Sequence, residues 1–173
     1  MSASASVIVT NNSRAVPAIL WAGLVSGILD ITAALIVYAH FGTFSVRLLQ
    51  GIASGLLGPD AFQGGLATAV LGLLCHFFIA TSAAAVYFVA SRRLPVLLEH
   101  AVVSGAAYGM AVYFFMQLVV IPLSAIGPRP LALEAVIVGV AIHVPCVGLP
   151  IALTLRRYAP ARPLADVPSA TEV

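Results

Sequence analysis

The chain has 173 residues, of which 61% are hydrophobic and only 8% are charged. A soluble domain carries about 25% charged residues, so these charges are too few to cover a globular surface. We therefore expect lipid to be the solvent for most of the chain, and an all-α polytopic membrane protein as the fold class. The net charge is +2, and the basic residues are all arginines at the ends of apolar runs, so no nucleic-acid-binding patch is indicated.

The chain begins with a mostly small and polar segment, residues 1–17, which is typical of a flexible tail. Four apolar runs follow, each long enough to cross a bilayer. They cover residues 18–39, 66–90, 101–122 and 131–155. The first run is too long for a cleaved signal peptide, and Asp30 interrupts it. We expect residues 18–157 to form a four-transmembrane-helix bundle and residues 158–173, which are rich in proline, to form a disordered tail.

The longest connection, residues 42–64, lies between the first and second spans. Four of its apolar residues recur with helical spacing: Phe44, Leu48, Ile52 and Leu56. This spacing predicts a short amphipathic interfacial helix, with Gln50 and Ser54 away from the apolar stripe, that ends at Gly58 and Pro59. A re-entrant segment is the alternative, and the pattern does not separate the two.

The distribution of arginines predicts the orientation of the chain. With four spans, the two tails and the 91–100 loop lie on one side of the membrane. That side carries Arg14, Arg92, Arg93, Arg156, Arg157 and Arg162, and the opposite side carries Arg47 and Arg129. Because cytoplasmic segments carry the excess of positive charge, we expect both termini in the cytoplasm.

Three ionisable residues fall near the middle of the apolar runs, namely Asp30, His76 and His143. Placing an ionised Asp at the centre of a bilayer costs about 2.5–3.5 kcal/mol, so partners are required. We expect the three side chains to form a buried polar site, with Tyr113 at a similar depth and Gln117 about one turn further out.

Several functions suit such a site. Asp30 and the two imidazoles could relay a proton or an ion, because imidazole titrates near neutral pH. Two His and one carboxylate, His76, His143 and Asp30, are also ligands for zinc or another transition metal. A b-type haem between the two histidines is a third alternative, although helix faces of glycine and alanine leave little space for a porphyrin.

The alternative to all of these is a structural or assembly subunit in which the same polar residues only fix the packing register between helices. No nucleophile triad, P-loop, dinucleotide fingerprint or HExxH motif is present, so the sequence favours a protein that is not an enzyme. Besides the lipid bilayer, the partners to consider are a second copy of the chain or another membrane subunit.

Small residues mark the helix faces on which transmembrane helices approach each other closely. The glycines expected at such contacts are Gly23, Gly27, Gly72, Gly105, Gly109 and Gly139. Pro145 and Pro150 follow His143 and remove backbone donors, so we expect a kink or hinge beside that histidine.

Three stretches carry a resemblance to known proteins: SGILD in the first span, ASGLLGPDAFQGG in the connection, and IPLSAIGP after the third span. Over residues 18–157 the chain resembles small uncharacterised bacterial inner-membrane proteins. The resemblance implies a bacterial inner-membrane location and four spans, and it carries no activity with it.

Overall fold

The computed structural model describes residues 3–40, 42 and 45–158, with side chains from Arg14 onward. All regular structure in this part of the chain is helical, which confirms the all-α prediction. The elements are α1 (Ala3–His40), α2 (Ser45–Leu57), η1 (Gly58–Gln63), α3 (Gly65–Arg93), α4 (Val96–Glu99), α5 (Ala101–Phe115), η2 (Met116–Val120), α6 (Ile121–Leu123), α7 (Leu133–His143), η3 (Val144–Gly148) and α8 (Leu149–Tyr158).

Four helical runs are long and apolar enough to cross a membrane, as the composition predicted. They are Arg14–His40 in α1, Gly65–Arg93 in α3, Ala101–Leu123 across α5, η2 and α6, and Leu133–Tyr158 across α7, η3 and α8. Helix α1 begins at Ala3, so it includes most of the segment expected to be a flexible tail. The expected C-terminal tail, apart from Tyr158, lies outside the described residues.

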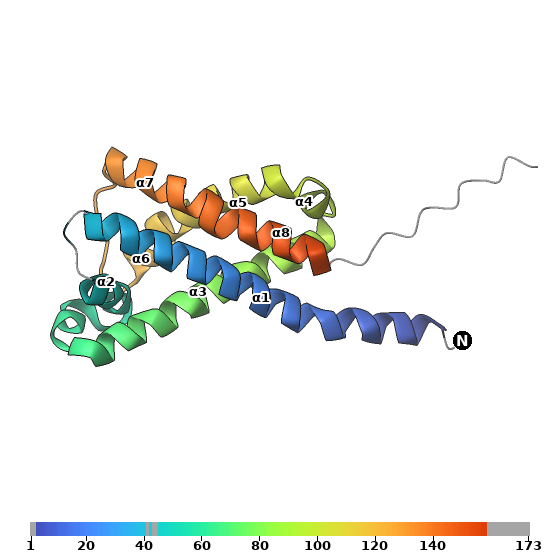
Figure 1. Ribbon diagram of the computed structural model, residues 1–173, viewed down its shortest axis with the longest axis horizontal. Coiled ribbons are helices and arrows are strands. Elements are labelled where there is room, and N and C mark those ends of the chain that lie inside the picture. Colours follow the sequence, from blue (N-terminus) through green and yellow to red (C-terminus); the bar gives the residue numbers. More distant parts are fainter. Residues whose placement is uncertain (1–2, 41, 43–44, 159–173) are drawn as a thin grey trace, which may run out of the picture.

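The long helices lie along one another in Figure 1, and α1 packs against both α3 and α8. Helix α5 packs against η3 and α8. The end of α3, the short helix α4 and the end of α8 lie at one end of the molecule, while α2 lies at the other (Figure 1). The arginine-rich ends of α3 and α8 therefore lie at the same end of the structure.

Helix α2 runs crosswise to the long helices, so that Figure 1 shows it nearly end-on, and it packs against α3. Its buried residues are Gln50, Ala53 and Ser54. Gln50 Nε2 donates a hydrogen bond to the carbonyl oxygen of Gly65 at 3.0 Å. The face expected to turn away from the apolar stripe is thus the buried one, because its polar groups bond to backbone carbonyls. Phe44, the first residue of the expected stripe, lies outside the described residues.

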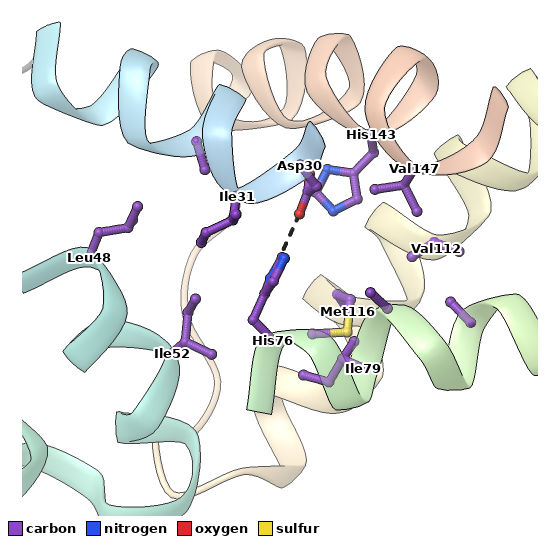
Figure 2. Close-up of a pocket in the computed structure, with 13 residues that line it drawn as sticks. Asp30, Ile31, Leu48, Ile52, His76, Ile79, Val112, Met116, His143 and Val147 are labelled. Carbon is purple, nitrogen blue, oxygen red and sulfur yellow. Dashed lines mark ion pairs between the residues drawn. The ribbon is translucent and has the colours of Figure 1, made fainter. Parts of the chain in front are cut away.

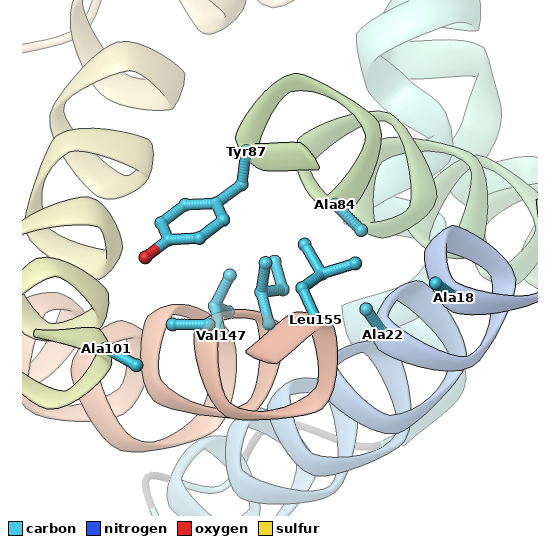
Figure 3. Packing of buried hydrophobic residues seen from close by; sticks show 9 residues of the cluster. Ala18, Ala22, Ala84, Tyr87, Ala101, Val147 and Leu155 are labelled. Carbon is cyan, nitrogen blue, oxygen red and sulfur yellow. The ribbon is translucent and has the colours of Figure 1, made fainter. Parts of the chain in front are cut away.

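A cluster of buried apolar residues lies near the end of the molecule that carries α4 (Figure 3). Small residues dominate it, and they let the surrounding helices come close together. Its members are Ala18, Ala22, Ala84, Tyr87, Ala101, Val147, Ile151, Ala152 and Leu155. Tyr87 Oη donates to the carbonyl oxygen of Leu97 at 2.8 Å, which joins α3 to α4. The cavity described below lies towards the opposite end, beside α2.

All six glycines expected at helix contacts lie where an added Cβ would overlap another segment. Two of these contacts are between the backbones of the third and fourth spans. A Cβ on Gly109 would lie 2.6 Å from the carbonyl oxygen of His143, and one on Gly105 would lie 2.9 Å from that of Gly148. Gly23 and Gly27 face Thr81 and Phe77 of α3, Gly72 faces Leu49 of α2, and Gly139 faces the ring of Tyr113.

Both later spans contain a π-helical turn next to a proline. In η3, which contains Pro145, the amide of Leu149 donates to the carbonyl oxygen of Val144, a bond that spans one residue more than in an α-helix. In η2 the amide of Ile121 bonds to Met116 in the same way, just before Pro122. The distortion expected beside His143 is therefore a widened turn, whereas a hinge movement at Pro145 and Pro150 stays a prediction.

We expect Gly109→Ala to lower the free energy of unfolding by about 1–3 kcal/mol, because the new methyl group must push α5 away from the backbone at His143 and Val144. Thermal unfolding in detergent measures the effect. Gly51→Ala in α2 is the matched control, since its Cβ would have no atom within 4 Å. Equal stability of the two variants would contradict the close contact at Gly109.

Candidate functional site

A cavity of about 210 Å³ lies where all four spans and α2 meet (Figure 2). Its walls are apolar except for three side chains, which are those of Asp30 on α1, His76 on α3 and His143 on α7. The three ionisable residues singled out in the sequence therefore line the same cavity. Because this space is lined mainly by hydrocarbon side chains, each polar group in it depends on the few partners that the neighbouring helices supply.

His76 forms the link between the first two spans. Its Nε2 lies 2.9 Å from the carbonyl oxygen of Gly27, one turn before Asp30. A carbonyl oxygen only accepts hydrogen bonds, so Nε2 must carry a proton and donate it. The other nitrogen, Nδ1, lies 4.0 Å from Oδ2 of Asp30, and Figure 2 shows the carboxylate directed at the ring. This distance is too long for a direct hydrogen bond but close enough for an ion pair.

The tautomer of His76 determines the charge that the pair can hold. With Nε2 protonated, a neutral ring would present the lone pair of Nδ1 to an ionised Asp30, and the two would repel each other. The contact is favourable when one additional proton is present, either on Nδ1 or on the carboxyl group. A proton between the two groups would therefore have two adjacent acceptor atoms, Nδ1 of His76 and Oδ2 of Asp30.

Asp30 is poorly satisfied for a carboxyl group in such a place. Its side chain is 17% exposed and that of His76 is 11% exposed. Its second oxygen, Oδ1, is buried and has no hydrogen-bond partner in the part of the chain that the structure describes. An unpaired buried polar atom costs about 1–3 kcal/mol, so the fold tolerates Asp30 at a loss of stability.

His143 is held differently, within its own helix. Its Nδ1 lies 2.9 Å from the carbonyl oxygen of Gly139 and donates to it. In the neutral ring Nε2 is then an acceptor. The ring packs edge-on against Tyr113, with centroids 5.3 Å apart. The neighbouring Tyr113 therefore fixes the orientation of the imidazole.

Two of the expected site residues are not part of the cavity wall. Tyr113 is buried but does not line the cavity. Its Oη donates to the carbonyl oxygen of Ala135 at 2.9 Å, which joins α5 to α7, and its ring packs against that of His143. Gln117 is half-buried in η2 and does not line the cavity.

The geometry does not favour the metal or the haem interpretation. Among the described residues, no group of three or more His, Cys, Asp and Glu side chains could hold a metal ion. Ligand pockets usually have volumes of about 300–1,000 Å³, so a cavity of about 210 Å³ is small for a porphyrin.

Sequence reasoning missed the contribution of α2 to the site. Leu48 and Ile52, which were assigned to a stripe facing the membrane surface, line the cavity beside Asp30. Their spacing of four residues shows that they share a helix face, but it does not show what that face contacts. Val112 and Met116 complete the wall from the third span, and no sequence signal distinguished them from lipid-facing residues.

Comparison with known proteins gives no match to any family model, curated protein or solved structure.

We expect Asp30→Leu to raise the free energy of unfolding by about 1–3 kcal/mol, because it removes a buried oxygen that lacks a partner. Thermal unfolding in detergent is the measurement. Asp60→Leu in η1 is the control, since Asp60 is exposed and should change little. A clear loss of stability in Asp30→Leu would instead mean that the carboxylate holds the helices together.

Proposed function

We propose that the protein is a multi-pass protein of the bacterial inner membrane, with its four spans packed as a bundle and both termini in the cytoplasm. The arginine count supports this orientation, since six arginines lie on the proposed inner side and two on the outer side. The bacterial location rests on the resemblance noted in the sequence. Helix α2 then lies across the outer end of the bundle, as an interfacial helix whose Leu48 and Ile52 also close the cavity.

The orientation can be tested with reporters. We expect alkaline phosphatase fused to the C-terminus of the full chain to be inactive in a bacterial host, because the enzyme folds only outside the cytoplasm, where its disulfides can form. The same reporter inserted after Pro128, in the α6–α7 connection, should be active. The reverse pattern of activity would overturn the proposed orientation.

We infer that the activity of the protein is proton handling, in which Asp30 and His76 take up and release one proton as a step in moving a proton or a cation across the membrane. The observation that carries this proposal is the 4.0 Å contact between Nδ1 of His76 and Oδ2 of Asp30, beside a buried Oδ1 with no partner. A purely structural pair would be expected to satisfy both carboxylate oxygens, because each unpaired atom costs stability.

A structural role is the second candidate. Two bonds favour it: the contact from His76 Nε2 to Gly27 holds α1 against α3, and the contact from His143 Nδ1 to Gly139 fixes a ring that packs on Tyr113. Both histidines therefore stabilise the fold through one nitrogen. The proton-handling proposal rests on the other side of the His76 ring, which faces Asp30.

We expect Asp30→Asn to abolish proton flux in proteoliposomes, because the amide has the same shape as the carboxyl group but cannot release a proton. A pH-sensitive dye inside the liposomes follows the flux under an imposed membrane potential. Asp60→Asn applies the same change to an exposed residue outside the cavity and should keep the wild-type rate.

Two outcomes would contradict proton handling by the pair. The first is an unchanged flux in Asp30→Asn, which would mean that protons do not pass through this carboxyl group. The second is a wild-type flux no greater than that of liposomes without protein. The structural role would then be the better account of the cluster.

A further inference from the structure

A second and larger cavity, of about 460 Å³, forms a groove between α3 and α5. Its walls are almost entirely hydrocarbon, and it is open to the surface along Phe78, Val86 and Phe115, which are 73%, 60% and 57% exposed. Its two hydroxyl groups are already satisfied. Ser82 Oγ donates to the carbonyl oxygen of Phe78 at 2.8 Å, and Tyr108 Oη donates to that of Ala83 at 2.7 Å.

The groove and the polar cavity share part of their walls. The shared residues are Ile79, Ala83, Val112 and Met116. The groove on the lipid-facing side of α3 and α5 is therefore separated from the cavity that holds Asp30, His76 and His143 only by these four side chains. Ligand sites commonly combine such an apolar volume with a few convergent polar groups.

The polar groups of the cavity are hydrogen-bond acceptors. Asp30 offers Oδ1, which has no partner in the described part of the chain, and Oδ2. His143 donates through Nδ1, which leaves Nε2 as an acceptor, and His76 donates through Nε2, which leaves Nδ1. A ligand head group that fits this set must donate hydrogen bonds, and a positive charge on it would pair with the Asp30 carboxylate.

We propose that the cavity and the groove form one binding site for a lipophilic primary ammonium, whose head lies at Asp30 and whose single hydrocarbon chain lies between α3 and α5. The proposal rests on the proposed function in one respect: the ammonium replaces the proton at Asp30. Phosphatidylethanolamine carries the same ammonium group. However, its phosphate would bring a negative charge to Asp30, and its two chains exceed the single groove, so a one-chain amine fits better.

Protection of Asp30 from an apolar carbodiimide, which adds to protonated carboxyl groups, tests the site in phosphatidylcholine liposomes. Peptide mass spectrometry locates the adduct, and Asp30→Asn shows the background. We expect dodecylamine to protect Asp30 at a concentration at least about tenfold lower than dodecanol, butylamine or dodecyltrimethylammonium. Dodecanol lacks the positive charge, butylamine lacks the long hydrocarbon chain, and dodecyltrimethylammonium lacks N–H groups that can donate.

Two variants of α5 test the place of the hydrocarbon chain. Ala111→Phe fills the groove and should raise the half-protecting concentration of dodecylamine at least about tenfold. Ala107→Phe makes the same change one turn away, outside the groove, and should leave it unchanged. Because both variants meet the same membrane surface, a non-specific effect of the amine on that surface would be equal in the two.

The remaining outcomes decide against the proposal. Equal protection by dodecanol, or no effect of Ala111→Phe, would overturn the ammonium head or the groove. Protection in liposomes that contain phosphatidylethanolamine, without added amine, would assign the site to the lipid. If the carbodiimide labels Asp30, no amine protects it, and Asp30→Asn still abolishes proton flux, only the ammonium proposal fails. If Asp30→Asn leaves the proton flux unchanged, the proposed function itself is contradicted.

Discussion

The backbone contact between the third and fourth spans is the constraint on which the rest of the structure depends. Gly105 and Gly109 let α5 approach the carbonyl groups of Gly148 and His143 so closely that no side chain fits between them. In a bilayer, lipid chains are as apolar as the helix surfaces, so helices associate through such close packing rather than by leaving water. The contact sets the position of His143, because its own backbone carbonyl lies at the interface.

The polar site combines two kinds of histidine. His76 donates a hydrogen bond from Nε2 to the carbonyl oxygen of Gly27 on a neighbouring helix, and so connects α1 to α3 at the level of the cavity. His143 donates from Nδ1 to the carbonyl oxygen of Gly139 in its own helix, and its ring is oriented by Tyr113. In both cases the bonded nitrogen fixes the ring and the remaining nitrogen faces the cavity wall. Sites that act on ligands or protons depend on this kind of support by surrounding groups.

Much of the fold could be predicted from the sequence, because an apolar run of about twenty residues has few alternatives to a membrane helix. The depth of Asp30, His76 and His143 in their runs was also sufficient to predict that they would line one space. The position of α2 could not be predicted, since its helical spacing does not reveal that Gln50 would bond to Gly65 and that Leu48 would line the cavity. Depth alone was not sufficient for Gln117, which does not line the cavity, since depth in an apolar run does not show which way a side chain points.

The π turn η3 also decides where the fourth span can change in length. It holds one residue more than an α-helical turn, between His143 on one side and the Gly148 contact on the other. The widened turn absorbs this extra residue, so a one-residue deletion inside it would restore a regular helix and leave α8 facing as it does now. The same deletion in the regular part of α8 would rotate the residues beyond it by about 100° and turn Leu155 out of the apolar cluster. Related sequences should therefore tolerate the loss of one residue within Val144–Gly148 but not within α8.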